Sequence, residues 1–229
     1  MGPSSLPGEP FPSIFVPLYY LEAVFRRGSY RTLASEITSR LSRGRILDVG
    51  TGPGLLPLEL ALRSPWLEVV GVDPSPGMIA LARRLCREAE GRVDFIVGGV
   101  YRLPFPSPSF DMVVSVGVLH HLLDLPKALA EILRVLKPGG EAWLYEVVMD
   151  AEWVEVRRTF REMKISPFPA LLLFSIHRLL SRVAGGRRII GMREEDVGRL
   201  EDALKVTELS WGMERRGSLL KVVLEKDGR

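Results

Sequence analysis

Two carboxylates and a glycine-rich loop carry the strongest chemical signal in the sequence. Asp48 stands just before a loop in which Gly50, Gly52 and Gly54 occupy alternate positions. Glycine lets a backbone turn sharply and approach a ligand without a clash from a Cβ atom. Asp73 ends the next apolar run, and an acid at the tip of a second strand can accept hydrogen bonds from both hydroxyls of a ribose. The pattern predicts a site for a cofactor that contains adenosine.

The glycine spacing and the charge of Asp48 separate two classes of adenosine cofactor. A dinucleotide fingerprint reads G-x-G-x-x-G, whereas this loop reads G-x-G-x-G and has Leu55 where the third glycine of the fingerprint would stand. A pyrophosphate would also meet the carboxylate of Asp48 unfavourably, because both are anionic. A cofactor with an ammonium and a sulfonium suits that carboxylate. A nicotinamide-dependent oxidoreductase, or a Rossmann-like fold without such a cofactor, is the alternative.

Buried strands and helices must hold these residues in place. Residues 45–49 and 67–73 are apolar and rich in branched side chains, which is typical of buried parallel strands. A helical pattern at 55–62 follows the glycine loop. Further strands are expected at 92–97, 110–115 and 141–148. A further helix is expected to open within 73–78 and run to about 87, and another is expected at 125–136. This arrangement predicts an α/β sheet with the cofactor site at the carboxyl edge of its strands.

The two ends of the chain complete the expected domain, 13–229. Apolar residues recur at intervals of three and four over 13–26 and 30–41, so two cap helices are expected within 13–43, with Gly28 as the break between them. Residues 1–12 are rich in Gly, Pro and Ser and are expected to form a disordered lead-in. At the other end we expect a helix at 194–204, strands at 206–211 and 218–225, and a hairpin loop at 212–217.

The ordered motifs between Arg45 and Glu146 resemble class I S-adenosylmethionine-dependent methyltransferases that act on small molecules and quinones. Beyond the glycine loop, the similar segments are L-P-F at 103–105, L-H-H-L at 119–122 and L-K-P-G-G at 136–140. The resemblance implies a seven-stranded, mostly parallel sheet with helices on both faces and an antiparallel last strand. It also implies S-adenosylmethionine as cofactor and in-line methyl transfer to an oxygen, nitrogen or carbon.

The resemblance also assigns the cofactor-binding residues by their positions. The glycine loop would hold the methionine end of the cofactor, Asp73 the ribose, and the segment around Gly99 the adenine. The full expected set is Asp48, Gly50, Thr51, Gly52, Gly54, Asp73, Pro74, Met78, Gly99, Val100 and Ser115. One position departs from the family, because Gly99 stands where the G-D-A-x-x-L-P-F segment has an Asp that accepts from the adenine amino group. A protein that binds S-adenosylmethionine without catalysis is therefore a second interpretation.

Four side chains are candidates for the acceptor side of the site. They are His120, His121, Tyr145 and His177. Neighbours on a helix diverge by about 100°, so the two adjacent histidines cannot play the same role. Each of the candidates can instead be a packed structural residue. A general base is needed only if the acceptor is protonated at the working pH.

Residues 151–191 interrupt the alternation of strands and helices as a helical insertion or lid. Nine basic and three acidic residues lie between Ala151 and Arg193, and helices are expected at 152–164 and 169–183. The region 165–183 is both basic and apolar, which suits core packing, a lid, an anionic membrane surface or a dimer contact. These features favour a small lipophilic or anionic acceptor. An RNA methyltransferase is the alternative enzyme, although the chain has no N-P-P-Y-type motif and no appended RNA-binding module.

Composition bears on the size of the domain, the cellular compartment, metal binding and the source organism. The chain has 229 residues and 46% apolar content, enough for one α/β domain with a substantial core. The single cysteine, Cys86, cannot form an internal disulfide, so a cytoplasmic setting is expected. The histidines and the cysteine show no zinc spacing, and no metal is expected. The chain has no Asn or Gln, which favours a thermophilic source or, alternatively, a GC-rich genome.

Overall fold

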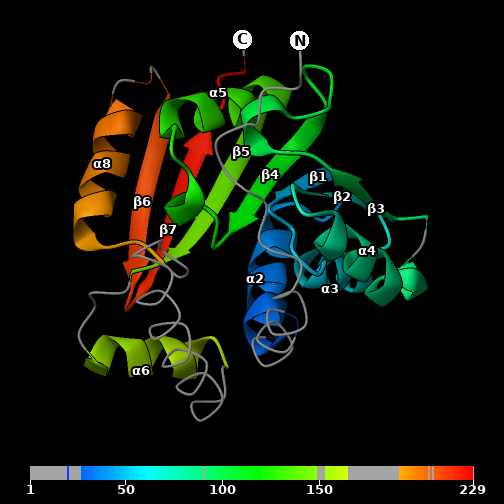
Figure 1. The fold of residues 1–229 in the computed structure, drawn as a ribbon, viewed down its shortest axis with the longest axis horizontal. Coiled ribbons are helices and arrows are strands. Elements are labelled where there is room, and N and C mark those ends of the chain that lie inside the picture. Colours follow the sequence, from blue (N-terminus) through cyan, green and yellow to red (C-terminus); the bar gives the residue numbers. More distant parts are fainter. Residues whose placement is uncertain are drawn as a thin grey trace.

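A computed structural model places a seven-stranded sheet at the centre of the protein (Figure 1). It describes residues 20, 27–89, 91–148, 153–164, 191–205, 207 and 209–228. The strands are β1 (Gly44–Val49), β2 (Leu67–Asp73), β3 (Val93–Val97), β4 (Phe110–Val116), β5 (Leu136–Val147), β6 (Ser210–Arg216) and β7 (Leu219–Glu225). Their order is β3-β2-β1-β4-β5-β7-β6. The first five strands pair in parallel and β7 runs antiparallel to β5, which confirms the expected sheet.

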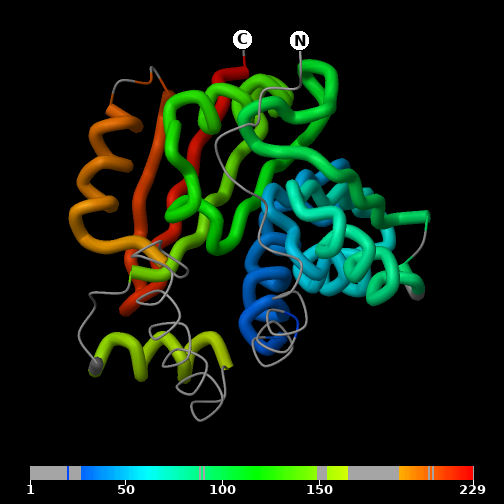
Figure 2. Tube along the Cα trace, in the orientation of Figure 1, coloured from blue at the N-terminus to red at the C-terminus, as the bar shows by residue number. Residues whose placement is uncertain are grey.

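Helices cover both faces of this sheet. They are α2 (Arg27–Arg40), α3 (Leu55–Arg63), α4 (Pro76–Leu85), α5 (Leu125–Val135), α6 (Trp153–Glu162) and α8 (Glu194–Lys205), with short 3₁₀ turns η2 (Arg87–Ala89), η3 (Val100–Arg102) and η4 (Leu119–His121). Because side chains alternate along a strand, Ile46 packs with α2, α3 and α4, whereas Leu47 packs with α5 and α8. In Figure 2 the early, blue-to-cyan part of the chain lies at one end of the sheet and the orange-to-red part at the other.

The register of the central strands brings the predicted site residues to one edge. Val49, near the end of β1, lies opposite Val72 of β2 on one side and Ser115 of β4 on the other. Since these strands are parallel, their carboxyl ends meet at the same edge of the sheet. The residues that follow β1, β2 and β4 therefore form one continuous surface.

The sequence analysis placed Gly28 between two helices, before the start of the second one. Gly28 lies inside α2, and a Cβ atom at this position would lie 2.5 Å from the carbonyl oxygen of Lys164. The glycine therefore permits a close approach by the backbone that follows α6. A contact between residues so far apart in the chain leaves no local mark in the sequence.

The prediction of a hairpin loop at 212–217 is wrong. Strand β6 extends to Arg216 and pairs with Leu219 of β7, so only a tight turn that begins at Gly217 joins the two strands. Gly217 has a φ of 62°, which suits the first position of a two-residue hairpin turn. The charged residues near the end of β6 resemble a loop in sequence, but pairing with β7 makes them the exposed end of an edge strand.

The L-K-P-G-G segment forms an irregular start to β5. Leu136 pairs with Phe110, and the next pair along the two strands joins Glu141 to Met112. The intervening residues loop out through Gly139, whose φ is 75°. The expected turn is thus present, but it lies within the strand as the structure defines it.

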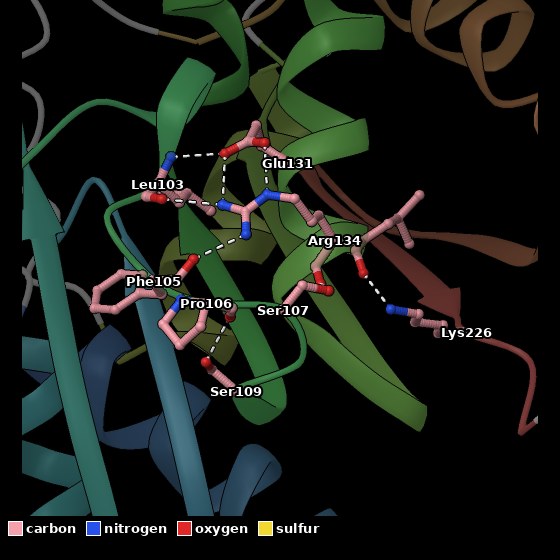
Figure 3. Close-up of polar contacts among 9 residues, drawn as sticks. Leu103, Phe105, Pro106, Ser107, Ser109, Glu131, Arg134 and Lys226 are labelled. Carbon is pink, nitrogen blue, oxygen red and sulfur yellow. Dashed lines mark hydrogen bonds and ion pairs between the residues drawn. The ribbon is translucent and has the colours of Figure 1, made fainter.

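A group of hydrogen bonds holds the segment after η3 against α5 (Figure 3). The Arg134 guanidinium donates to Glu131 through Nε and Nη2, at 2.7 and 2.9 Å from the two carboxylate oxygens. It also donates to the carbonyl oxygens of Leu103 at 3.0 Å and Phe105 at 2.8 Å, and Glu131 accepts from the Leu103 amide at 2.7 Å. This Glu131–Arg134 clamp gives the L-P-F segment a structural role.

Some predicted features lie outside the described residues. They are the lead-in at 1–12, the helix at 13–26 apart from residue 20, the region 165–183, and His177. Within the described part of the chain, no helix combines the length and apolar character that a membrane crossing requires.

Candidate cofactor and active site

The glycine loop after β1 has a backbone that only glycine adopts easily. Gly50, Gly52 and Gly54 have φ values of 73°, 52° and 77°, in the left-handed region that L residues avoid. A Cβ atom on Gly50 would also lie 2.3 Å from Cγ2 of Val118. The loop therefore packs closely on the segment that follows β4.

Hydrogen bonds join this loop to the tip of β2. The amides of Gly50 and Thr51 both donate to the carbonyl oxygen of Val72, at 2.8 and 3.0 Å. The amide of Gly52 donates to Oδ2 of Asp73 at 3.0 Å. The loop and the acid at the end of β2 thus form one rigid unit.

Asp73 organises the start of α4 as well as the loop. Its Oδ1 accepts from the amide of Ser75 at 2.9 Å, and Ser75 caps α4 by accepting from the amide of Met78. Burial raises the pKa of Asp73, and the hydrogen bonds from Ser75 and Gly52 oppose that rise. A carboxylate oxygen can accept more than one hydrogen bond, so Asp73 can still accept from a ribose. Met78 is buried beside it and Pro74 is exposed.

Asp48 is a buried acid beside a pocket formed by the loop. It is 2% exposed, and its Oδ2 accepts from the Thr51 hydroxyl at 2.7 Å. Burial raises its pKa to about 7, and the Thr51 hydroxyl opposes that rise. No Lys, Arg or His of the described residues forms an ion pair with it. The pocket is lined by Tyr30, Asp48, Gly50, Thr51, Gly52, Pro53, Leu56 and Val116.

The expected adenine side begins where β3 ends. The amide of Gly98 donates to the carbonyl oxygen of Asp73 at 3.0 Å, and Val100 starts η3 as a buried residue. A Cβ atom on Gly99 would have no atom within 4 Å. The missing acid at this position is therefore not a consequence of crowding.

Ser115 joins the expected methionine end to the sheet. Its hydroxyl donates to the carbonyl oxygen of Val49 at 2.9 Å, and the side chain is buried between β1 and β4. The Ser115 hydroxyl is thus used within the sheet, so a cofactor contact would fall mainly to the backbone groups of this residue.

His120 and Glu146 form a buried pair at the ends of β4 and β5. The His120 side chain is 5% exposed and the Glu146 side chain 1%, with Nδ1 2.9 Å from Oε2. Glu146 also accepts from the backbone amides of Val147, at 2.9 Å, and His120, at 3.3 Å. Burial opposes ionisation of Glu146, but the charge of His120 and these hydrogen bonds outweigh it and hold the pKa of Glu146 below its ordinary value.

The other nitrogen of the His120 ring is buried without a partner. Among the described residues, no donor or acceptor contacts its Nε2. His121 is exposed, and its ring centroid lies 3.9 Å from that of His120. The two histidines therefore occupy different environments, as expected for neighbours on a helical turn.

Comparison with known proteins identifies the domain that contains these features. Residues 47–144 match the family described as "Methyltransferase domain". Over this stretch the chain is similar to methyltransferase domains, and the strand order and the glycine loop agree with that similarity. The matched span runs from the end of β1 to β5, so it includes the glycine loop, Asp73 and the His120 segment.

Curated relatives and solved structures agree with this assignment. The chain is 40% identical over 120 residues to demethylmenaquinone methyltransferase of Deinococcus radiodurans, covering 52% of this chain and 49% of the relative. It is 41% identical over 106 residues to a ubiquinone/menaquinone biosynthesis C-methyltransferase of Geobacter sulfurreducens, covering 45% and 41%. The chain thus spans about half the length of the curated relatives it matches.

The solved structures share the fold of the methyltransferase domain. A structure from Methanococcus maripaludis, assigned as an S-adenosylmethionine-dependent methyltransferase, aligns with a TM-score of 0.73 at 22% identity and covers 98% of each chain. An S-adenosylmethionine-dependent methyltransferase of Aquifex aeolicus aligns with a TM-score of 0.59 at 19% identity, covering 84% of this chain and 88% of the other.

The residues of this methyltransferase domain fit the cofactor that the family implies, S-adenosylmethionine. A buried acid without a cationic partner is costly, and Asp48 is such an acid beside the glycine-lined pocket. The ammonium group of the cofactor would supply the missing charge. The carboxylate of Asp73 is fixed by two backbone amides and would accept from the ribose. Adenine is the less well-matched part, because Gly99 offers space but no acceptor side chain.

The structure separates the acceptor-side candidates of the methyltransferase domain. Tyr145 and Glu146 are neighbours on β5 and therefore point to opposite faces of the sheet. Tyr145 is buried in the cluster beneath α2, where burial raises its pKa. The sequence analysis counted Tyr145, and not Glu146, among the acceptor-side candidates. The available signal was an acid at an inward position of an otherwise apolar strand.

Proposed function

We propose that this protein transfers a methyl group from S-adenosylmethionine to a small-molecule acceptor. The observation that carries the proposal is the buried carboxylate of Asp48 beside the glycine loop, which forms no ion pair with any of the described residues. Such a carboxylate suits a cationic cofactor and not a pyrophosphate. When bound, S-adenosylmethionine supplies an electrophilic methyl group. The role of the chain is to align the acceptor with that group and exclude water, and alignment alone can supply much of the acceleration.

Each part of the cofactor has proposed partners in the chain. Asp48, Thr51 and the three loop glycines hold the methionine end, together with backbone groups of Ser115. Asp73 accepts from the ribose hydroxyls. The adenine lies among side chains and backbone groups of the β2 and β3 ends, with contributions from Pro74, Met78, Gly99 and Val100.

We propose a lipophilic, quinol-like acceptor. Two relatives with 40% and 41% identity are named for menaquinone or ubiquinone biosynthesis, and the basic, apolar region 165–183 suits contact with such a molecule or with a membrane surface or second copy. A cytoplasmic setting accords with the single buried thiol of Cys86. We propose no nucleic acid as acceptor or partner.

Calorimetric titration tests the cofactor assignment directly. The protein is titrated with S-adenosylmethionine, S-adenosylhomocysteine and NAD, and we expect binding of the first two alone. Binding of NAD alone would contradict the proposal. Formation of S-adenosylhomocysteine with a reduced 1,4-naphthoquinone then distinguishes an enzyme from a binding protein, since a protein that only binds the cofactor forms none.

A further inference from the structure

We propose that Glu146 positions His120 as the proton acceptor for a weakly acidic substrate, such as a phenol or a quinol. The inference rests on the proposed methyl transfer and adds a chemical requirement to it. The acceptor must carry a hydroxyl proton that has to leave before its oxygen or a conjugated carbon can attack a methyl group. Glu146 acts through His120 and is a positioning residue.

The first evidence is the way the Glu146 carboxylate is held. Oε1 accepts from the Val147 amide, and Oε2 accepts from the His120 amide. The carboxylate is therefore fixed before it meets the imidazole, and Nδ1 of His120 lies 2.9 Å from Oε2. An ionised carboxylate only accepts hydrogen bonds, so Nδ1 must carry the proton of this contact. In the neutral ring Nε2 is then the atom with a free lone pair.

The second evidence is the environment of Nε2. This atom is buried and has no hydrogen-bond partner among the described residues. Buried polar atoms in native proteins are nearly always paired, so an exception calls for an explanation. The hydroxyl of a bound acceptor would provide the missing partner. The geometry matches the general arrangement in which a base is oriented by a third group.

The third evidence is the position of the pair at the edge of the sheet. Turn η4 directly follows Val118, whose side chain occupies the space above Gly50 of the cofactor loop. Val116, at the end of β4, lines the same pocket as Asp48. Glu146 stands near the end of β5, the strand beside β4. The pair thus adjoins the loop that holds the reactive end of the proposed cofactor.

The proposed step is a single proton transfer. The O–H bond of the acceptor breaks, its proton bonds to Nε2, and its electron pair stays on the acceptor oxygen as the nucleophilic charge. The imidazolium that forms is stabilised by the carboxylate of Glu146 and later returns its proton to solvent. Within the described residues, the titratable groups in contact with His120 are Glu146 on β5 and His121 on η4.

Nitrogen NMR of the His120 imidazole in the free protein tests the pair without any substrate. We expect the neutral ring of the wild type to hold its proton on Nδ1, and Glu146→Gln to weaken that preference, because an amide can also donate to Nδ1. Glu131→Gln is the matched control, because it removes the charge of another ion-paired glutamate and should leave the tautomer unchanged. A proton on Nε2 in the neutral wild type, or the same tautomer populations in Glu146→Gln, would overturn the inference.

The pH dependence of turnover provides the second test. With a reduced 1,4-naphthoquinone as acceptor, His120→Gln should lower kcat by about a hundredfold or more and leave the KM for S-adenosylmethionine within about twofold. Glu146→Gln should move the acidic limb of the kcat profile to lower pH. Equal losses in kcat and cofactor affinity with an unmoved limb would mean a structural role. Absence of any turnover by the wild type would instead contradict the proposed function itself.

Discussion

Two glutamate-centred pairs in this protein differ in how completely their polar groups are used. In the Glu131–Arg134 clamp the side chains are 19% and 34% exposed, and each guanidinium nitrogen donates to Glu131 or to a backbone carbonyl. In the Glu146–His120 pair both side chains are at least 95% buried, yet Nε2 of His120 has no partner among the described residues.

The difference distinguishes a structural pair from one that is ready to bind. In the Glu131–Arg134 clamp each guanidinium nitrogen has a hydrogen-bond partner, and the clamp holds the segment 103–105 against α5. The second pair leaves one buried polar atom without a partner among the described residues, and a buried hydrogen bond that is not made costs about 1–3 kcal/mol. Such a cost persists in a native protein when a ligand or a reaction needs the free atom.

Removing His120 should have the largest effect on stability. His120→Ala leaves Glu146 buried without its partner, so we expect the free energy of unfolding at pH 7 to fall by about 3 kcal/mol or more. Urea unfolding measures this loss. Replacement of the exposed neighbour, His121→Ala, is the control and should change stability by no more than about 0.5 kcal/mol.

The difference in stability between the wild type and His120→Ala should depend on pH. The folded-state pKa of Glu146 is lowered, so the pair stabilises the protein above the ordinary pKa of about 4.3. That contribution is lost as the pH falls through the folded-state value. The gap between wild type and His120→Ala should therefore narrow at acidic pH. A difference in the free energy of unfolding that is small at pH 7, or that is the same at pH 7 and at acidic pH, would contradict the role of the buried pair.

Asp48 is also a buried acid, but it forms no ion pair with any of the described residues. The next largest effect concerns the ionisation of Asp48. Its folded-state pKa is raised to about 7, so the ammonium of S-adenosylmethionine should bind about tenfold more tightly at pH 7 than at pH 5.5. Both of these pH values lie below the ordinary α-amino pKa of about 7.7–8.0, so the amino group of the cofactor is mostly protonated at each. The sign for the free protein is opposite, because a raised acid pKa makes its stability fall as the pH rises from about 4 to 7.

Calorimetry at the two pH values measures the dependence on Asp48. Asp48→Asn is the control and should remove most of the difference, leaving the part due to Asp73, whose pKa is also raised. If the wild type binds equally well at both pH values, the ammonium does not depend on the ionised Asp48.

The clamp should show a smaller effect that is confined to stability. Glu131→Gln removes the charge from a partly exposed pair, so we expect a loss of about 1 kcal/mol in the free energy of unfolding. Thermal unfolding measures it. The acidic limb of the kcat profile should stay where it is in the wild type. A shifted limb would remove the distinction between the two pairs.

The smallest predicted effect comes from adding a carboxylate at Gly99. The backbone there has a φ of −106° and open space for a side chain, so Gly99→Asp is expected to fold normally. A hydrogen bond to the adenine amino group should tighten S-adenosylmethionine binding about fivefold, or about 1 kcal/mol. Gly99→Ala separates the effect of the carboxylate from that of the added bulk and should not tighten binding. An unchanged affinity in Gly99→Asp would place the adenine elsewhere.

The sequence alone determined the elements whose signals are local. The apolar run at 67–73 coincides with β2, and the acids and glycines around the first two strand ends lie together as expected. Periodicity of apolar residues and the backbone freedom of glycine act over a few residues, so they can be read directly.

Tertiary structure decided what depends on contacts between distant segments. At Gly28, within α2, the backbone of Lys164 approaches more closely than a Cβ atom would allow, and the end of β6 is a strand because β7 pairs with it. Tyr145 points away from Glu146 because neighbouring side chains on a strand alternate between faces. Glu146 lies against His120 because the register of β4 and β5 brings the ends of these strands together. Register is set by packing across the whole sheet, so no short stretch of sequence contains it.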